Sequence, residues 1–194
     1  MNEDSIKEKI IQATINLMKE DSEDITVRNI AARAGVTQGL INYHYQTKDH
    51  LIDISAQRVI DETVSKVPMA WMQMEGTPEE KLRVMMKRTL SYLFEYPHVS
   101  RISIMRDMQA GHNKDNTQSS IDAFDKLLQH TIADKGKRFL AGHVFCAAMQ
   151  SLFLRSDVIM ETQGMDVADS AVQRQFIDDL VDLVLGGFLS CKIK

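Results

Sequence analysis

The chain of 194 residues contains few residues that interrupt or crosslink a fold, with three prolines, nine glycines and two cysteines. No low-complexity run or internal repeat is present, which excludes a repeat array. Cys146 and Cys191 are far apart and do not have metal-ligand spacing. Cys146 lies in an apolar run and is expected to be a reduced core residue. This cysteine usage favours a reducing, cytoplasmic location.

Signals for export, membrane insertion and catalysis are also missing. The N-terminal MNEDSIKEKI has no basic region followed by an apolar stretch, so no signal peptide is expected. The most apolar segment, 139–154, is shorter than the about 20 residues of a membrane span and is interpreted as a buried helix. No nucleophile–His–carboxylate set, phosphate loop or metal motif appears. We therefore expect no enzyme activity, no catalytic residue, no metal, no cofactor and no membrane partner.

The charge balance argues mildly against nucleic acid as a default partner, because the net charge is −4. One window differs from the rest of the chain. Between Ile25 and Lys48 there are three cations, Arg28, Arg33 and Lys48, and no acidic residue. Any DNA-binding function must therefore depend on this window.

Helical periodicity extends along the chain, and no segment convincingly predicts a strand. A first amphipathic helix is predicted from Ile6, Ile10, Ala13 and Leu17. Thr26 stands as the N-cap of a short second helix at 27–34, and Gly35 follows that helix as a C-terminal glycine does. Thr37 is the predicted cap of a third helix at 38–45, and Thr47 of a fourth helix from Lys48. Two short helices joined by a tight turn containing glycine form a helix-turn-helix.

Three adjacent rings in the third helix, Tyr43, His44 and Tyr45, cannot all face one core. At about 100° per residue, Tyr45 shares the inward face with Ile41. Tyr43 points outward with Gly39, Asn42 and Gln46, and His44 lies at the edge.

The remainder of the chain is predicted to be a larger helical bundle. Pro68 and the segment after it mark a boundary, and further helices end near Pro97, Gly111, Gly136 and Gly164. The expected total is about nine helices. The predicted fold class is all-α, with a small N-terminal unit followed by a bundle.

The segment TVRNIAARAGVTQGLINYHYQTKDHLI, residues 26–52, resembles the DNA-binding domain of the TetR/AcrR family of bacterial transcriptional regulators. The resemblance is dense over roughly residues 6 to 60, and beyond them it is limited to the helix count and the terminal helix pair. One departure is Tyr45, where the family commonly has Phe, so a buried hydroxyl needs a partner. The resemblance implies a DNA-binding domain at 1–50, a connecting helix at 51–67, and an effector-binding and dimerisation domain at 68–194.

The resemblance also implies that the third helix enters the major groove of double-stranded DNA. Gln38, Asn42 and Tyr43 are suited to read bases, and Gly39 allows a close approach. Phosphate contacts would position the protein, with His44 either a phosphate ligand or a helix-packing residue. The expected DNA contacts are Thr26, Arg28, Thr37, Gln38, Gly39, Asn42, Tyr43, His44 and Lys48.

A single recognition helix contacts few bases, so a homodimer on a palindromic operator is expected. The last two helices are the candidates for the dimer contact, and the glycine pair Gly186-Gly187 suits a close helix approach. An ordinary intramolecular core helix is the alternative. The expected interface residues are Phe176, Leu180, Leu183, Val184, Gly187 and Phe188.

By the same resemblance, the larger domain binds a small effector that changes DNA affinity. The twelve methionines and the phenylalanines favour an apolar or aromatic effector and leave a cationic group open, although methionines at helical spacing are more often plain core. We expect a repressor released by its effector; the alternative is a DNA- or protein-binding module on the same fold without a small-molecule switch. The expected effector-binding residues are Met86, Leu90, Phe94, Met105, Met108, Phe124, Leu128, Met149 and Phe153.

Overall fold

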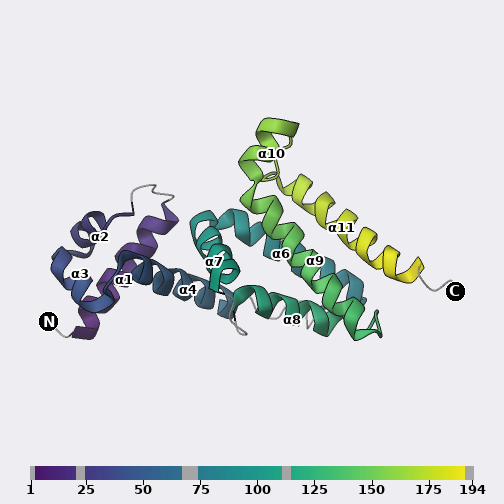
Figure 1. Cartoon of the computed structure of the whole chain (residues 1–194), viewed down its shortest axis with the longest axis horizontal. Helices are drawn as coiled ribbons and strands as arrows, with labels where there is room; N and C mark the ends of the chain where they lie inside the picture. The colour runs from purple at the N-terminus through teal and green to yellow at the C-terminus, as the bar shows by residue number, and fades with distance from the viewer. Residues whose placement is uncertain (1–2, 21–24, 67–73, 111–114, 191–194) are drawn as a thin grey trace. The chain divides into compact units, whose positions relative to one another are not determined.

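The computed structural model describes residues 3–20, 25–66, 74–110 and 115–190 (Figure 1). Within these residues it contains ten helices and no strand, which confirms the predicted all-α fold. None of these helices combines the length and apolar character that a membrane crossing requires. The chain divides into two compact units: unit 1 is Met1–Pro68 with Tyr96–Ser103, and unit 2 is Met69–Glu95 with Ile104–Lys194.

Unit 1 holds the helix-turn-helix. It comprises α1 (Glu3–Lys19), α2 (Val27–Ala34), α3 (Gln38–Tyr45), α4 (Lys48–Lys66) and the beginning of α7 (Pro97–Ala110). Helix α1 packs against both α2 and α4, and α3 contacts α2 and α4. The centre of this core is fully buried and consists of Ile10, Ile30, Ile41, Leu51 and Val99.

Local capping explains where the short helices begin and end. The Thr26 hydroxyl accepts a hydrogen bond from the Asn29 amide at 3.2 Å, and Thr37 accepts one from the Leu40 amide at 3.4 Å. Gly35 has φ of 66°, a left-handed conformation that glycine adopts without a steric cost, and it ends α2. These caps confirm the boundaries predicted from the sequence. The predicted boundary at residues 67 and 68 lies outside the described residues.

Unit 2 is a bundle of α6 (Pro78–Glu95), α8 (Asn116–Leu128), α9 (Lys135–Leu154), α10 (Ser156–Gln163), α11 (Ser170–Ser190) and the rest of α7. Thr77 and Glu80 form a reciprocal capping box that starts α6. Helices α8 and α9 pack side by side in Figure 1, and a Cβ added to Gly142 of α9 would lie 3.2 Å from Ile121 Cγ2 of α8. The expected single helix from about residue 137 to Gly164 is wrong, because non-helical φ and ψ at Arg155 divide it into α9 and α10.

Candidate nucleic-acid interface

The third helix presents two faces, as its wheel predicts. Tyr45 is 5% exposed, and its hydroxyl donates a hydrogen bond to the Lys7 carbonyl at 3.1 Å. Burial raises the pKa of Tyr45, so this hydroxyl remains a donor at neutral pH. Tyr43, two residues earlier, is 76% exposed. The inward position of Tyr45 and the outward position of Tyr43 are therefore confirmed.

His44 lies at the edge of α3, where its ring packs against α1. The side chain is 4% exposed, and Nδ1 lies 3.8 Å from Glu3 Oε1. Its ring also meets those of Tyr43 and Tyr45 edge-on, at centroid distances of 5.0 and 6.4 Å. Such a ring has little surface to offer a phosphate, so these contacts support the packing alternative for His44.

Four exposed residues of α3 form one continuous face, which we call the recognition surface: Gln38, Gly39, Asn42 and Tyr43. A Cβ at Gly39 would approach only the Thr37 hydroxyl, at 3.8 Å, so this part of the helix is open. The surface combines amide donors and acceptors, an aromatic ring and a bare stretch of backbone. These groups can meet base edges in a major groove.

Exposed cations lie on both sides of the recognition helix in the sequence. Arg28 on α2 and Lys48, the first residue of α4, are exposed. Arg33 instead forms an ion pair with Glu20 at 2.6 Å, and hydrogen bonding to this carboxylate raises the pKa of Arg33. Thr26 and Thr37 are exposed, although their hydroxyls already serve as caps. The positive charge available to a phosphate beside α3 therefore comes from Arg28 and Lys48.

One feature of this region was not found from the sequence: the backbone at Gln46, immediately after α3. Gln46 has φ of 64° and ψ of −53°, and it is the only residue other than glycine with positive φ in the described part of the chain. The Thr47 amide donates a hydrogen bond to the Tyr45 carbonyl at 2.7 Å and closes a γ-turn. Positive φ at the central residue makes it the rarer, strained form of this turn. A non-glycine residue in such a conformation costs about 1–3 kcal/mol. No sequence signal distinguishes this turn, because Gln does not favour positive φ.

The predicted dimer surface on α11 lies beside the core face of this helix. Ile177, Val181 and Leu185 are buried in unit 2. The stripe expected to form the interface lies on the adjacent flank, with Phe176, Leu180 and Val184 half-buried, and Leu183 74% exposed. Gly187 is exposed with open space where a Cβ would be, and the Phe188 side chain lies outside the described residues.

Helix α9, which contacts α11, adds exposed apolar residues that the sequence analysis did not single out. Leu140 is 50% exposed and Val144 36% exposed, and Ala147 follows at helical spacing. The sequence contains a signal for this stripe, because Leu140, Val144 and Ala147 are separated by four and then three residues. This helical spacing predicts a second apolar stripe on α9, next to the one that contains Phe145 and Met149.

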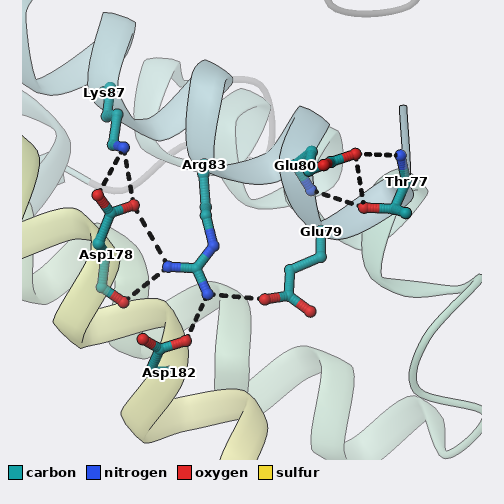
Figure 2. A network of polar contacts seen from close by, with 7 residues as sticks. All are labelled: Thr77, Glu79, Glu80, Arg83, Lys87, Asp178 and Asp182. Atoms are coloured by element: carbon teal, nitrogen blue, oxygen red, sulfur yellow. Dashed lines mark hydrogen bonds and ion pairs between the residues drawn. The ribbon is translucent and has the colours of Figure 1, made fainter. Parts of the chain in front are cut away.

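An ion-pair network fixes α11 against α6 (Figure 2). Arg83 of α6 donates hydrogen bonds to Glu79 of its own helix, to the Asp178 carbonyl and carboxylate, and to the Asp182 carboxylate. Lys87 Nζ lies 2.7 Å from the Asp178 carboxylate. Burial by itself would lower the pKa of Arg83, but the three carboxylates together raise it. The network holds one flank of α11, and the apolar stripe occupies the other.

The residues expected to bind an effector separate into two groups. Met105 and Met108 of α7 are exposed, at 42% and 59%. Phe94 is half-buried and meets the Phe153 ring edge-on at 5.3 Å. The other members are brought together in the interior of unit 2: Met86, Leu90, Phe124, Leu128, Met149 and Phe153.

A chain of hydrogen bonds in unit 2 begins at Asp107, a buried carboxylate. The Asp107 carboxylate accepts hydrogen bonds from the Thr117 amide and hydroxyl, each at 2.9 Å, and Gln150 donates to the same hydroxyl at 2.9 Å. Asp115 is the N-cap of α8, and Asp107 accepts from a second amide of its first turn, so the chain links α7, α8 and α9. These hydrogen bonds join residues 10 and 33 positions apart, so no local sequence pattern predicts them.

Comparison with known proteins agrees with this geometry. The family model of bacterial regulatory proteins, tetR family, matches residues 10–53, which include α2 and α3. These residues therefore form a TetR-family DNA-binding domain. The match supports a DNA-binding regulator of the TetR family, with the helix-turn-helix as its DNA-binding element.

Similar proteins extend the TetR-family likeness beyond the helix-turn-helix. The nucleoid occlusion factor SlmA of Yersinia pestis is 24% identical over 173 residues, covering 78% of this chain and 84% of SlmA. A transcriptional regulator from Rhodococcus sp. RHA1 has the same fold, with a TM-score of 0.69, 17% identity and coverage of 93% and 96%. The regulator FadR from Bacillus subtilis, in complex with stearoyl-CoA, matches with a TM-score of 0.62, 17% identity and coverage of 93% and 98%.

Proposed function

We propose that this TetR-family regulator is a dimeric repressor that binds a palindromic operator through α3 and leaves it when a small apolar or aromatic effector binds unit 2. The observation that carries the proposal is the division of α3 between Tyr45, which is anchored in the core, and the exposed recognition surface. Base contacts specify a DNA site and phosphate contacts position the protein. We assign base reading to Gln38, Asn42 and Tyr43, and phosphate binding to Lys48 and Arg28.

The surfaces of α9 and α11 support a second copy of the chain as the dimer partner. Leu183 and Leu140 are apolar side chains that are at least half exposed, on two helices in mutual contact. Removing such side chains from water favours association. Open space at Gly186 and Gly187 allows a partner helix to approach the backbone of α11 closely.

The interior of unit 2 supports an apolar effector. The six interior side chains from α6, α8 and α9 are two Met, two Phe and two Leu, and flexible thioethers can rearrange around an apolar guest. FadR from Bacillus subtilis, which has the same fold, binds stearoyl-CoA, a molecule with a long apolar chain. A ligand that prefers the conformation with low DNA affinity would release the operator, and DNA would weaken ligand binding by the same factor.

Genome-wide mapping of DNA bound by the full chain tests the proposal and supplies the operator. Binding of that operator is then compared between the parent protein and Tyr43→Ala, with Gln109→Ala on α7 as a matched surface control. We expect Tyr43→Ala to lose specific binding by about tenfold or more, because a good base contact contributes about 1–3 kcal/mol. Equal binding by the parent and Tyr43→Ala would contradict the assignment of α3.

A second candidate function is a DNA- or protein-binding module without a small-molecule switch. It is favoured by the dense packing of the six interior side chains and by similarity to a nucleoid occlusion factor. Thermal shift measurements with a chemical library separate the two candidates. Stabilisation by apolar or aromatic compounds, together with loss of operator binding, supports the switch, whereas stabilisation only by strongly anionic polar metabolites contradicts the apolar effector.

A further inference from the structure

The strained turn at Gln46 lies between two anchored elements of unit 1. On one side, Tyr45 is fixed by burial and by its hydrogen bond to the Lys7 carbonyl. On the other side, the Thr47 hydroxyl accepts a hydrogen bond from the His50 amide at 3.2 Å and caps α4. A single residue therefore joins the end of α3 to the cap of α4. The conformation persists because both neighbours are held in place.

The positive φ determines where the Gln46 side chain points. In an L-residue, Cβ and the carbonyl carbon are separated by about 120° of rotation about the N–Cα bond. The Gln46 amide still donates to the Asn42 carbonyl at 3.0 Å, as in a helix, while φ is 64° instead of the about −63° of a helix. Cβ consequently takes the direction that the carbonyl carbon takes in a continuing helix. The Gln46 side chain, which is exposed, therefore leaves the backbone in the direction in which α3 would have continued.

The length of α3 indicates what lies at that end when the helix occupies a groove. Eight residues at about 1.5 Å each give about 12 Å, which is close to the width of the major groove. The ends of such a helix approach the phosphodiester backbones. The C-terminal end carries a partial negative charge of about half a unit, which repels phosphate. A hydrogen-bond donor that extends past the carbonyls can offset this repulsion, and the Gln46 amide is such a donor.

We propose that Gln46 is a DNA-contact residue whose side-chain amide, directed by the strained turn, donates a hydrogen bond to a phosphate at the C-terminal end of α3. This inference rests on the proposed function of α3 as the recognition helix. The Gln46 amide would be a neutral donor beside the charged Lys48 contact. It would strengthen binding to DNA of any sequence and would not contribute to sequence specificity.

Operator binding by the full chain, measured by fluorescence anisotropy across a salt series, tests this contact. Gln46→Ala retains the Cβ and the turn but removes the amide, and we expect three- to tenfold weaker binding to operator and non-operator DNA alike. The melting temperature should be unchanged. Gln46→Lys places a charge at the same position, and we expect the slope of log K against log salt to steepen by about 0.9. Gln109→Lys, the same substitution in unit 2, should leave the slope unchanged.

Three results would overturn the inference. The first is unchanged binding by Gln46→Ala, and the second is an equal salt slope for Gln46→Lys and Gln109→Lys. The third is weakening by Gln46→Gly alone, with Gln46→Ala like the parent, because the turn and not the amide would then be responsible. Tyr43→Ala and Lys48→Ala are measured in parallel. If they weaken binding while the Gln46 variants do not, only this inference fails; if none does, the proposed function of α3 fails too.

Discussion

The Tyr45 hydroxyl donates a hydrogen bond to the Lys7 carbonyl at 3.1 Å, which ties the C-terminal end of α3 to the N-terminal part of α1. These residues are 38 positions apart in the sequence. The bond satisfies the hydroxyl that a Phe at this position would lack. It also fixes the inward face of the helix whose outward face is proposed to read DNA.

Replacing Tyr45 separates the contribution of the ring from that of its hydroxyl. Tyr45→Phe should lower the free energy of unfolding by about 0.5–1.5 kcal/mol, the usual contribution of one hydrogen bond. Tyr45→Ala should lower it by about 3–5 kcal/mol, because it leaves a cavity in the core. Urea denaturation provides the measurement, and Tyr43→Phe, which removes an exposed hydroxyl from the same helix, is the control. Equal losses for Tyr45→Phe and Tyr45→Ala would show that ring burial contributes little.

Lys48 should contribute affinity without specificity. Lys48→Ala should weaken binding to operator and unrelated DNA by similar factors and reduce the magnitude of the salt slope by about 0.9, the value for one phosphate contact. The comparison variant is Lys126→Ala, which removes the same charge from an exposed position on α8. A loss confined to operator DNA would instead make Lys48 a base-reading residue.

Leu183 provides a test of the dimer surface. Its side chain is 74% exposed, so Leu183→Glu should have little effect on the folding of one subunit. In a dimer joined through α11, however, the change would bury a carboxylate, and the dimer dissociation constant should rise by at least tenfold. Sedimentation equilibrium checks this. Val84→Glu, at an apolar α6 position that is 42% exposed, is the control; a Leu183→Glu dimer as tight as the parent would exclude this surface.

Asp178 should make the stability of unit 2 depend on pH. Burial by itself would raise the pKa of this carboxyl, but hydrogen bonds and charge interactions with Lys87 and Arg83 lower it below its ordinary value of 3.8. Because the folded pKa is the lower one, the stabilisation is complete above the unfolded pKa and is lost as pH falls through the folded pKa.

The parent protein should therefore have a higher melting temperature than Asp178→Asn at pH 7, and the difference should shrink as pH falls below about 4. Differential scanning calorimetry over this range gives the comparison. Asp179→Asn, which changes an exposed carboxylate on the same helix, should show a smaller difference at pH 7. A difference between the parent and Asp178→Asn that is independent of pH would mean that charge at Asp178 has no role.

Local chemistry determined which parts of unit 1 were predictable. Thr26, Gly35 and Thr37 act on groups within a few residues, so the sequence shows both the signal and its effect. The position of His44 depends on Glu3, a residue of another helix 41 positions earlier, and the helical wheel therefore leaves it undecided. Gln46 has no favourable intrinsic preference for its turn, which the anchored neighbours impose.

In unit 2, the core face of α11 could not be separated from its flank by pattern alone. Ile177 and Phe176 are both apolar and differ by one position, about 100° around the helix. The network of Arg83 with Asp178 and Asp182 resolves this ambiguity in the structure, because it fixes one flank of α11 against α6. These partners are 95 and 99 residues from Arg83, a distance at which a single sequence carries no pairing signal.

The interleaving of the two units along the chain limits how this protein can be divided. Val99, at the beginning of α7, is 1% exposed in the core of unit 1, and Tyr96 and Ile102 pack against that core. A recombinant fragment that stops at residue 66 would leave the Val99 site empty and expose apolar surface of the unit 1 core. A chimaera that exchanges DNA specificity with a relative should therefore carry residues 96–103 together with the N-terminal helices, because a single crossover leaves the graft with a mismatched core.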